Sequence, residues 1–141
     1  MTRINIHVPP INLCNEHLIA EHRELKRIPN AIKNGTSVIK NIPSTFRLGE
    51  GHVKFFYNKL GYLKKRYSQL HSECIRRNFE VQDYSDSFKD LPEHLFGDLQ
   101  HSNSDRLTVE KRIEERLGKM KNIHYLRDSI TAEEAIKILK K

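Results

Sequence analysis

His17-Leu-Ile-Ala-Glu-His-Arg-Glu-Leu-Lys-Arg27 is the stretch that decides the fold, because its apolar and charged residues repeat at helical spacing. Side chains three, four and seven positions apart share one face of a helix. His17, Glu21 and Glu24 therefore form a polar stripe with two basic residues beside it, Arg23 and Arg27. The apolar stripe behind them consists of Cys14, Leu18, Leu25, Ile28 and Ile32. The pattern predicts an amphipathic helix, and a merely solvated outer face is the simplest explanation of its charges.

The segment before this helix alternates apolar and other residues and then reaches Pro9-Pro10, which forbids a helix and ends any strand. We interpret residues 1–11 as an extended arm. It would lay Thr2 and Arg3 against the helix, for which Asn12 is a suitable cap. The alternating apolar residues of the arm are Ile4, Ile6 and Val8.

The segment after the helix is predicted to be irregular. Pro29 should end or kink the helix in its last third, and Asn34-Gly35 indicates a turn. Residues 36–51 are expected to form a loop in which Gly49 and Gly51 let the backbone adopt positive φ or approach a ligand closely. A simple turn and a phosphate cradle both fit these residue types.

Residues 52–77 show helical spacing of apolar side chains, which one long helix or two consecutive helices would satisfy. The repeating positions are Phe56, Leu60, Leu63, Tyr67, Leu70 and Cys74. We expect Phe55, Phe56 and Tyr67 in the core. The basic residues predicted to lie on the outside are Lys54, Lys59, Lys64, Lys65 and Arg66.

The carboxyl-terminal half is predicted to hold a long surface loop over residues 79–104 and two more helices. Asp105 can cap the first of these, whose apolar stripe is Val109, Ile113, Leu117 and Met120, and Gly118 can end it. Thr131-Ala-Glu-Glu134 is a capping box that opens the second. We therefore predict an all-α fold: one compact domain over residues 1–141, with three main helices, long loops and an extended amino-terminal arm.

Charge is unevenly distributed along the 141 residues, whose net charge is +7. Residues 1–80 carry 14 basic and 6 acidic side chains, residues 81–110 carry 2 and 7, and residues 111–141 carry 9 and 5. A basic body with an acidic middle segment is typical of a protein that binds a polyanion on one face, and nucleic acid is the leading candidate. Charge that serves only solubility is the alternative.

Other features exclude several classes of protein. The sequence has no apolar run approaching 18 residues and no apolar signal core, so we expect an intracellular protein that does not bind membranes. Cys14-x-x-His17 and His71-x-x-Cys74 could together form a zinc site, but both cysteines fall on apolar stripes. We therefore expect free thiols, no metal and no cofactor.

The chain start suggests a nucleophile. Met1 precedes the small residue Thr2, the usual context for methionine removal, which would expose the Thr2 amine. The pKa of an α-amino group is about 7.7–8 against about 10.4 for lysine, so roughly a quarter of the amine is neutral near physiological pH. That fraction gives it a few-hundred-fold advantage over a lysine as a nucleophile.

Several segments resemble the phage-type pyrimidine-dimer DNA glycosylases, the endonuclease V family. The amino-terminal ones are Thr2-Arg3-Ile4-Asn5, His17-Leu18, Ala20-Glu21, Arg23-Glu24-Leu25 and Arg27. The central ones are Leu48-Gly49-Glu50-Gly51-His52-Val53-Lys54-Phe55-Phe56-Tyr57 and Lys59-Leu60, and a weaker similarity at Leu91-Pro92 and Gly97-Asp98 extends to about residue 117. The aromatic-rich basic segment that ends members of the family is not found after residue 117.

The resemblance implies a DNA glycosylase with abasic-site lyase activity on cyclobutane pyrimidine dimers in double-stranded DNA, acting as a monomer in a bacterial or a phage- or virus-infected cell. The Thr2 amine would attack the sugar, and Glu24 would stabilise its positive charge. We prefer a structural role for Glu21. The residues expected to contact DNA are Arg3, His17, Arg23, Arg27, Gly49, Gly51, Lys111, Arg112 and Arg116. A structural hydrogen bond is the open alternative for His17.

Two other functions fit the same sequence. A non-catalytic basic helical DNA-binding protein would bind DNA in a salt-sensitive manner without a covalent intermediate. A helical interaction protein would show no DNA affinity above generic electrostatic attraction.

Overall fold

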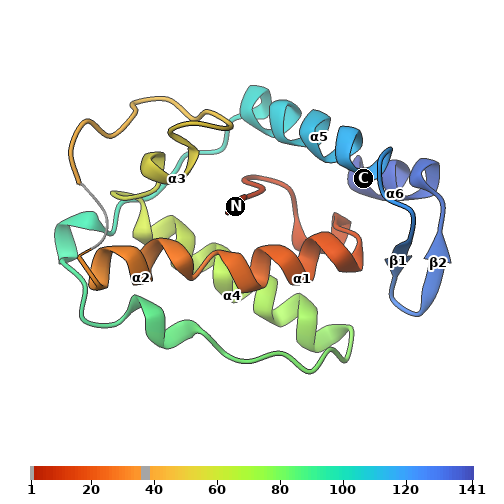
Figure 1. Ribbon diagram of the computed structural model, residues 1–141, viewed down its shortest axis with the longest axis horizontal. Helices are drawn as coiled ribbons and strands as arrows, with labels where there is room; N and C mark the ends of the chain where they lie inside the picture. Colours follow the sequence, from red (N-terminus) through yellow and green to blue (C-terminus); the bar gives the residue numbers. More distant parts are fainter. Residues whose placement is uncertain (1, 36–38) are drawn as a thin grey trace.

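The structure is a computed structural model that describes residues 2–35 and 39–141 (Figure 1). Its longest described helices are α1 (Asn15–Glu24), α4 (Leu60–Arg76) and α5 (Asn103–Leu117). α1 packs against α4, and the arm lies between α1 and α5, near the centre of the molecule in Figure 1. The shorter helices are α2 (Arg27–Lys33), α3 (His52–Phe55) and α6 (Ala132–Leu139).

The predicted first helix is divided into α1 and α2 at Leu25 and Lys26. Pro29 explains the position of the break, because it cannot donate a hydrogen bond to the carbonyl of Leu25 and its ring clashes with that carbonyl. The prediction that Asn12 caps the helix is wrong. Asn12 ends a 3₁₀ turn that begins at Pro10, and its Nδ2 donates instead to the Leu139 carbonyl at 3.3 Å.

The arm is part of the core. Its alternating residues Ile4, Ile6 and Val8 are fully buried, and the arm has no helix or strand over residues 2–5 before it turns at residues 6–8. The predicted turn at Asn34-Gly35 is present, with Gly35 at φ +70°. Residues 36–38 and Met1 lie outside the described residues, as does the predicted removal of Met1.

Residues 52–77 form two consecutive helices, α3 and α4, and the predicted core residues Phe55, Phe56 and Tyr67 are buried. The exposed position predicted for Arg66 is wrong, since its side chain is only 3% exposed. Residue 66 lies three positions after Leu63 and four before Leu70, on the stripe that faces the core. The charge of Arg66 is therefore held inside the protein.

The acidic segment over residues 79–104 is mostly irregular, as predicted, with short 3₁₀ helices at Ser85–Phe88 and Glu93–Leu95. Phe88 and Leu95 are buried and attach it to the core. The next helix, α5, buries Val109, Ile113 and Leu117 and ends at Gly118 as predicted. Its cap is Ser102 rather than Asp105, because the Asp105 backbone N–H donates to Ser102 Oγ at 3.2 Å.

A small antiparallel sheet corrects the all-α prediction. β1 (Ile123–Tyr125) pairs with β2 (Asp128–Ile130), with Ile123 opposite Ile130. The hairpin tip docks on α1: Asn15 Nδ2 donates to the Leu126 carbonyl at 2.7 Å, and the Leu126 N–H donates to Asn15 Oδ1 at 3.1 Å. α6 follows with the predicted capping box formed by Thr131 and Glu134. The fold is thus mostly helical, with one short hairpin held by side-chain contacts.

Candidate active site

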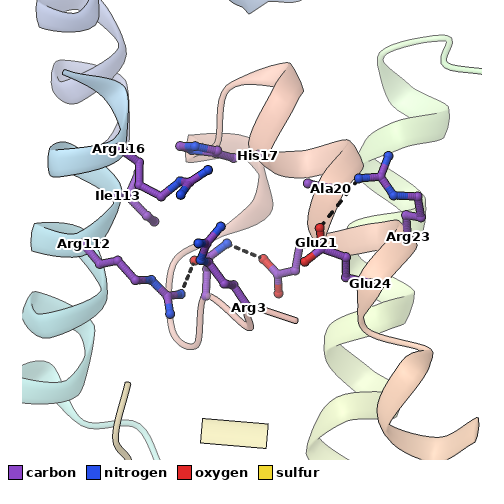
Figure 2. Close-up of a pocket in the computed structure, with 10 residues that line it drawn as sticks. Arg3, His17, Ala20, Glu21, Arg23, Glu24, Arg112, Ile113 and Arg116 are labelled. Atoms are coloured by element: carbon purple, nitrogen blue, oxygen red, sulfur yellow. Dashed lines mark hydrogen bonds and ion pairs between the residues drawn. The ribbon is translucent and has the colours of Figure 1, made fainter. Parts of the chain in front are cut away.

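A cavity of about 230 Å³ lies between the arm, α1 and α5. Figure 2 shows arginines extending from α5 on one side, Glu21, Glu24 and Arg23 from α1 on the other, and Arg3 between them. We call this the α1 cavity. Its lining residues are Arg3, Asn5, His17, Ala20, Glu21, Arg23, Glu24, Arg112, Ile113 and Arg116.

A second cavity, of about 550 Å³, contains Thr2. We call it the Thr2 cavity. It is lined by Thr2, Arg3, Gly49, His52, Val53, Arg112 and Arg116. Three arginines, Arg3, Arg112 and Arg116, line both cavities. The arm therefore brings Thr2 to a cavity that shares three arginines with the α1 cavity.

Glu21 is held by a buried network. Its carboxylate accepts hydrogen bonds from Arg66, Nε to Oε2 at 2.8 Å and Nη2 to Oε1 at 2.9 Å. Asn5 Nδ2 also donates to Glu21 Oε1, at 2.9 Å. Burial alone would lower the pKa of Arg66, but the charge and hydrogen bonds of Glu21 raise it. The negative charge of Glu21 is thus balanced within the protein, which favours its structural role.

Glu24 is the other carboxylate of the α1 cavity. Its nearest cation is Arg23, with Nη2 3.6 Å from Oε2, and the Glu24 side chain is 15% exposed. Partly exposed ion pairs at such a distance are weak. Glu24 therefore remains accessible to a molecule that enters the cavity.

The shared arginines carry charge that the protein does not neutralise. Within residues 2–35 and 39–141, no carboxylate forms an ion pair with Arg3, Arg112 or Arg116. Burial, followed by repulsion from Arg3, lowers the pKa of Arg112 to about 10. A bound anion would stabilise this cluster of like charges, and a phosphodiester is an anion that arginine binds well.

His17 faces the α1 cavity without a hydrogen-bond partner for its buried Nε2 in the part of the chain that the structure describes. Burial and then the charge of Arg116 lower the pKa of His17 to about 4, with Arg112 and Arg3 acting in the same direction and Glu16 against it. His17 is therefore neutral at physiological pH. Nε2 therefore does not make the structural hydrogen bond that was the alternative role of His17.

A model of the family described as pyrimidine dimer DNA glycosylase matches residues 1–86. The chain belongs to this family. The matched stretch spans the arm and all of α1 to α4, and it contains both carboxylates of the α1 cavity. A glycosylase of this family acts on DNA, and DNA supplies the phosphates that the shared arginines would bind. Arg112 and Arg116 lie outside the matched stretch, on α5, and line both cavities from there.

Other predicted DNA contacts lie apart from the two cavities. Gly51 lines a third cavity of about 610 Å³ together with Gly49, Arg47 and Lys54. Both glycines have positive φ, +66° at Gly49 and +85° at Gly51, so each permits the turn before α3. Arg27 and Lys111 are exposed and do not line these three cavities.

Sequence reasoning missed two residues of the site. Asn5 links Glu21 to Arg112, since Asn5 Nδ2 donates to Glu21 and Arg112 Nη2 donates to Asn5 Oδ1 at 2.8 Å. His52 lies in the segment that resembles the family, but its position relative to the other predicted site residues gave no reason to assign it to the site. Contacts between the arm, α3 and α5 give both residues their place, and no local pattern encodes such contacts.

The remaining predictions concern the two cysteines, metal binding and membrane-spanning helices. Cys14 and Cys74 are buried free thiols, and burial raises the pKa of each to about 11. Among the described residues, no three His, Cys, Asp or Glu side chains are grouped closely enough to hold a metal ion. No described helix combines the length and the apolar character that a bilayer crossing requires.

Proposed function

We propose that this family member excises the base at ultraviolet-type cyclobutane pyrimidine dimers in double-stranded DNA and then cleaves the strand as an abasic-site lyase. The observation that supports it best is the juxtaposition of Thr2, accessible Glu24 and three arginines without carboxylate partners in two neighbouring cavities. The residues divide into a nucleophile, an electrostatic partner and a phosphate grip.

The nucleophile is the Thr2 amine after removal of Met1. Its nitrogen lone pair forms a bond to C1′ of the damaged nucleotide, and the glycosidic bond breaks with its electrons leaving on the base nitrogen, which takes up a proton. Opening of the sugar ring puts a proton on O4′ and gives an imine between the amine and C1′. Loss of a proton from C2′ then expels the 3′ phosphate by β-elimination, and water hydrolyses the imine.

Glu24 stabilises the positive charge that develops on the sugar and accepts or returns the protons of these steps. It takes this role because the charge of Glu21 is engaged by Arg66, whereas Glu24 is only weakly paired with Arg23. His17 lines the same cavity as a neutral hydrogen-bonding group.

The phosphate grip consists of the shared arginines and Arg23, with more peripheral contacts from Arg27, Lys111 and the backbone at Gly49 and Gly51. The proposed enzyme acts as a monomer built as one domain over residues 1–141. It works on DNA inside a bacterial cell or a phage- or virus-infected cell, with no metal or cofactor in the reaction.

Borohydride trapping tests the proposal, because it reduces an imine to a stable covalent bond. Protein with a verified Thr2 amino terminus should be trapped on duplexes that carry a pyrimidine dimer or an abasic site. Protein that retains Met1, or whose Thr2 amine is acetylated, should still bind DNA but give no trapped complex. Salt-sensitive binding without trapping by the processed protein would instead identify a non-catalytic DNA-binding protein.

A further inference from the structure

The peptide groups of Ile4, two residues after Thr2, are held on both sides. The Ile4 backbone N–H donates to His52 Nε2 at 3.0 Å. The Ile4 carbonyl accepts a hydrogen bond from Arg112 Nη2 at 3.4 Å, and the same nitrogen donates to Asn5 Oδ1. With its side chain fully buried as well, Ile4 is the point at which the arm is fixed.

The hydrogen bonds also fix the proton on His52. Its Nδ1 lies 2.9 Å from the Arg47 carbonyl oxygen, which can only accept, so Nδ1 carries the proton. Nε2 faces the N–H of Ile4 and must therefore present its lone pair. A charged imidazolium has a proton on both nitrogens, so only the neutral ring can make both contacts.

The surroundings of His52 maintain this neutral form. The ring is 3% exposed and packs edge-on against Phe46 and Phe56. Burial is the main reason that the pKa of His52 is lowered to about 4. The hydrogen bond to the Arg47 carbonyl acts in the opposite direction and raises the pKa of His52. Among the charged groups that face the ring, Arg112 of α5 and Arg3 of the arm lower the pKa, and Glu21 of α1 raises it.

The position of the arm matters for the proposed reaction because the nucleophile is the first group of the mature chain. Chain termini are disordered unless contacts tie them down, and a displacement of about 1 Å can reduce a reaction rate about a hundred-fold. His52 lines the Thr2 cavity, but both of its ring nitrogens are engaged by the protein. It is therefore suited to placing the amine and not to reacting with the substrate.

We propose that neutral His52 is a positioning residue, which holds the Ile4 amide and thereby aligns the Thr2 amine with the sugar in the Thr2 cavity. This inference rests on the proposed function of Thr2. It adds α3 to the catalytic apparatus, because His52 is the first residue of α3. The turn that contains Gly49 and Gly51 thus leads directly into the residue that orients the nucleophile.

The test is the single-turnover rate of borohydride trapping on an abasic duplex at saturating processed protein. His52→Phe removes both ring nitrogens and should slow trapping about a hundred-fold, with DNA affinity changed much less. His52→Gln keeps an acceptor near the position of Nε2 and should recover part of the rate. His94→Gln, at an exposed position in the segment 79–104, is the matched control and should trap like wild type.

Trapping by both His52 variants at the wild-type rate would overturn the inference. Two measurements on the wild-type protein decide it even if His52→Phe does not fold. The ¹⁵N spectrum should show a protonated Nδ1 and an unprotonated Nε2 in His52, and the Ile4 amide should be protected from hydrogen exchange. A protonated Nε2 or a rapidly exchanging Ile4 amide would show that His52 does not fix the arm. If both results are as expected but the wild-type protein is not trapped, only the chemical role of Thr2 is refuted.

Discussion

At the scale of single residues, the site separates two carboxylates that lie one helical turn apart on α1. Glu24→Gln keeps the volume of the side chain and removes its charge, so folding and DNA binding should persist. Loss of one electrostatic partner of a cationic transition state typically costs about 3–4 kcal/mol, a several-hundred-fold fall in rate. The rate of base excision on a dimer-containing duplex should fall by at least that factor, and trapping on a pre-formed abasic site should fall less.

Glu21→Gln is the comparison variant, and its main effect should be on stability. Gln cannot neutralise Arg66, and one of its amide N–H groups would face the guanidinium. Removing one partner of a buried ion pair destabilises a protein by about 3–5 kcal/mol, which a denaturant titration would measure. If instead Glu21→Gln is stable and abolishes excision while Glu24→Gln excises normally, the catalytic carboxylate is Glu21.

Arg66 also shows where residue-level prediction from sequence ends. The polar stripe of His17, Glu21 and Glu24, all of which line the α1 cavity, could be read from their spacing. The inward position of Arg66 also follows from its spacing to Leu63 and Leu70, yet a charged residue is normally assigned to the surface. Its partner Glu21, 45 positions away in the chain, neutralises that charge, and the Val8 carbonyl accepts a further hydrogen bond from it.

At the scale of elements, α5 supplies arginines from outside the stretch that matches the family. Arg116 is the cleaner test of the two, because Arg112 also holds the arm. Arg116→Ala should weaken binding to damaged and undamaged duplexes alike and reduce the slope of log affinity against log salt by about one unit. Lys89→Ala is the control: Lys89 is exposed and paired with Asp86 in the acidic segment, and its removal should leave the slope unchanged. An unaltered slope in Arg116→Ala would place this arginine off the DNA.

A second element-scale prediction concerns the start of α4, where Gly97 lies against the backbone of Asn58. A Cβ at residue 97 would lie 2.4 Å from the Asn58 carbonyl oxygen, so the backbones must separate. The Gly97 carbonyl also accepts a hydrogen bond from the Tyr62 N–H at 3.1 Å, which that movement would strain. Gly97→Ala should lower the free energy of unfolding by about 1–3 kcal/mol in a denaturant titration.

Gly118→Ala is the matched substitution. Gly118 has a helical φ of −65°, and the nearest atoms to an added Cβ are 3.6 Å away. Alanine there should be neutral or should stabilise the protein by about 0.5 kcal/mol, because it restricts the unfolded chain. Equal destabilisation by both substitutions would mean that the contact at Asn58 is not the cause.

The elements that could be predicted are those with a local cause. Apolar spacing identifies α4 and α5, and the capping box identifies α6. The β1–β2 hairpin has strands of three residues each and no Asn-Gly or Asp-Gly turn, so its local signal is weak. The hydrogen bonds between Asn15 and Leu126, more than a hundred residues apart, hold its tip on α1, and nothing near the hairpin in sequence encodes them.

At the scale of the whole molecule, three histidines are kept neutral by the fold, and this predicts how stability depends on pH. Burial is the largest cause that lowers the pKa of His17, His22 and His52, each to about 4 from an ordinary value of 6.5. Between these values the unfolded chain binds protons that the folded protein does not. The free energy of unfolding is therefore fully present above about pH 6.5 and decreases as the pH falls toward 4.

The expected slope is up to about 1.4 kcal/mol per pH unit for each histidine, and it is best measured by urea titrations above about pH 5, where most carboxylates stay ionised. His22→Gln should reduce the slope by about one histidine's share, because His22 lies outside both cavities and contributes through its contacts with Tyr67 and His71. His94→Gln, at an exposed position, should leave the slope as in wild type. If the stability of the wild-type protein is constant between about pH 6.5 and 5, the three histidines take up protons in the folded state as they do in the unfolded chain. The same measurement would then exclude a neutral His52 that fixes the arm.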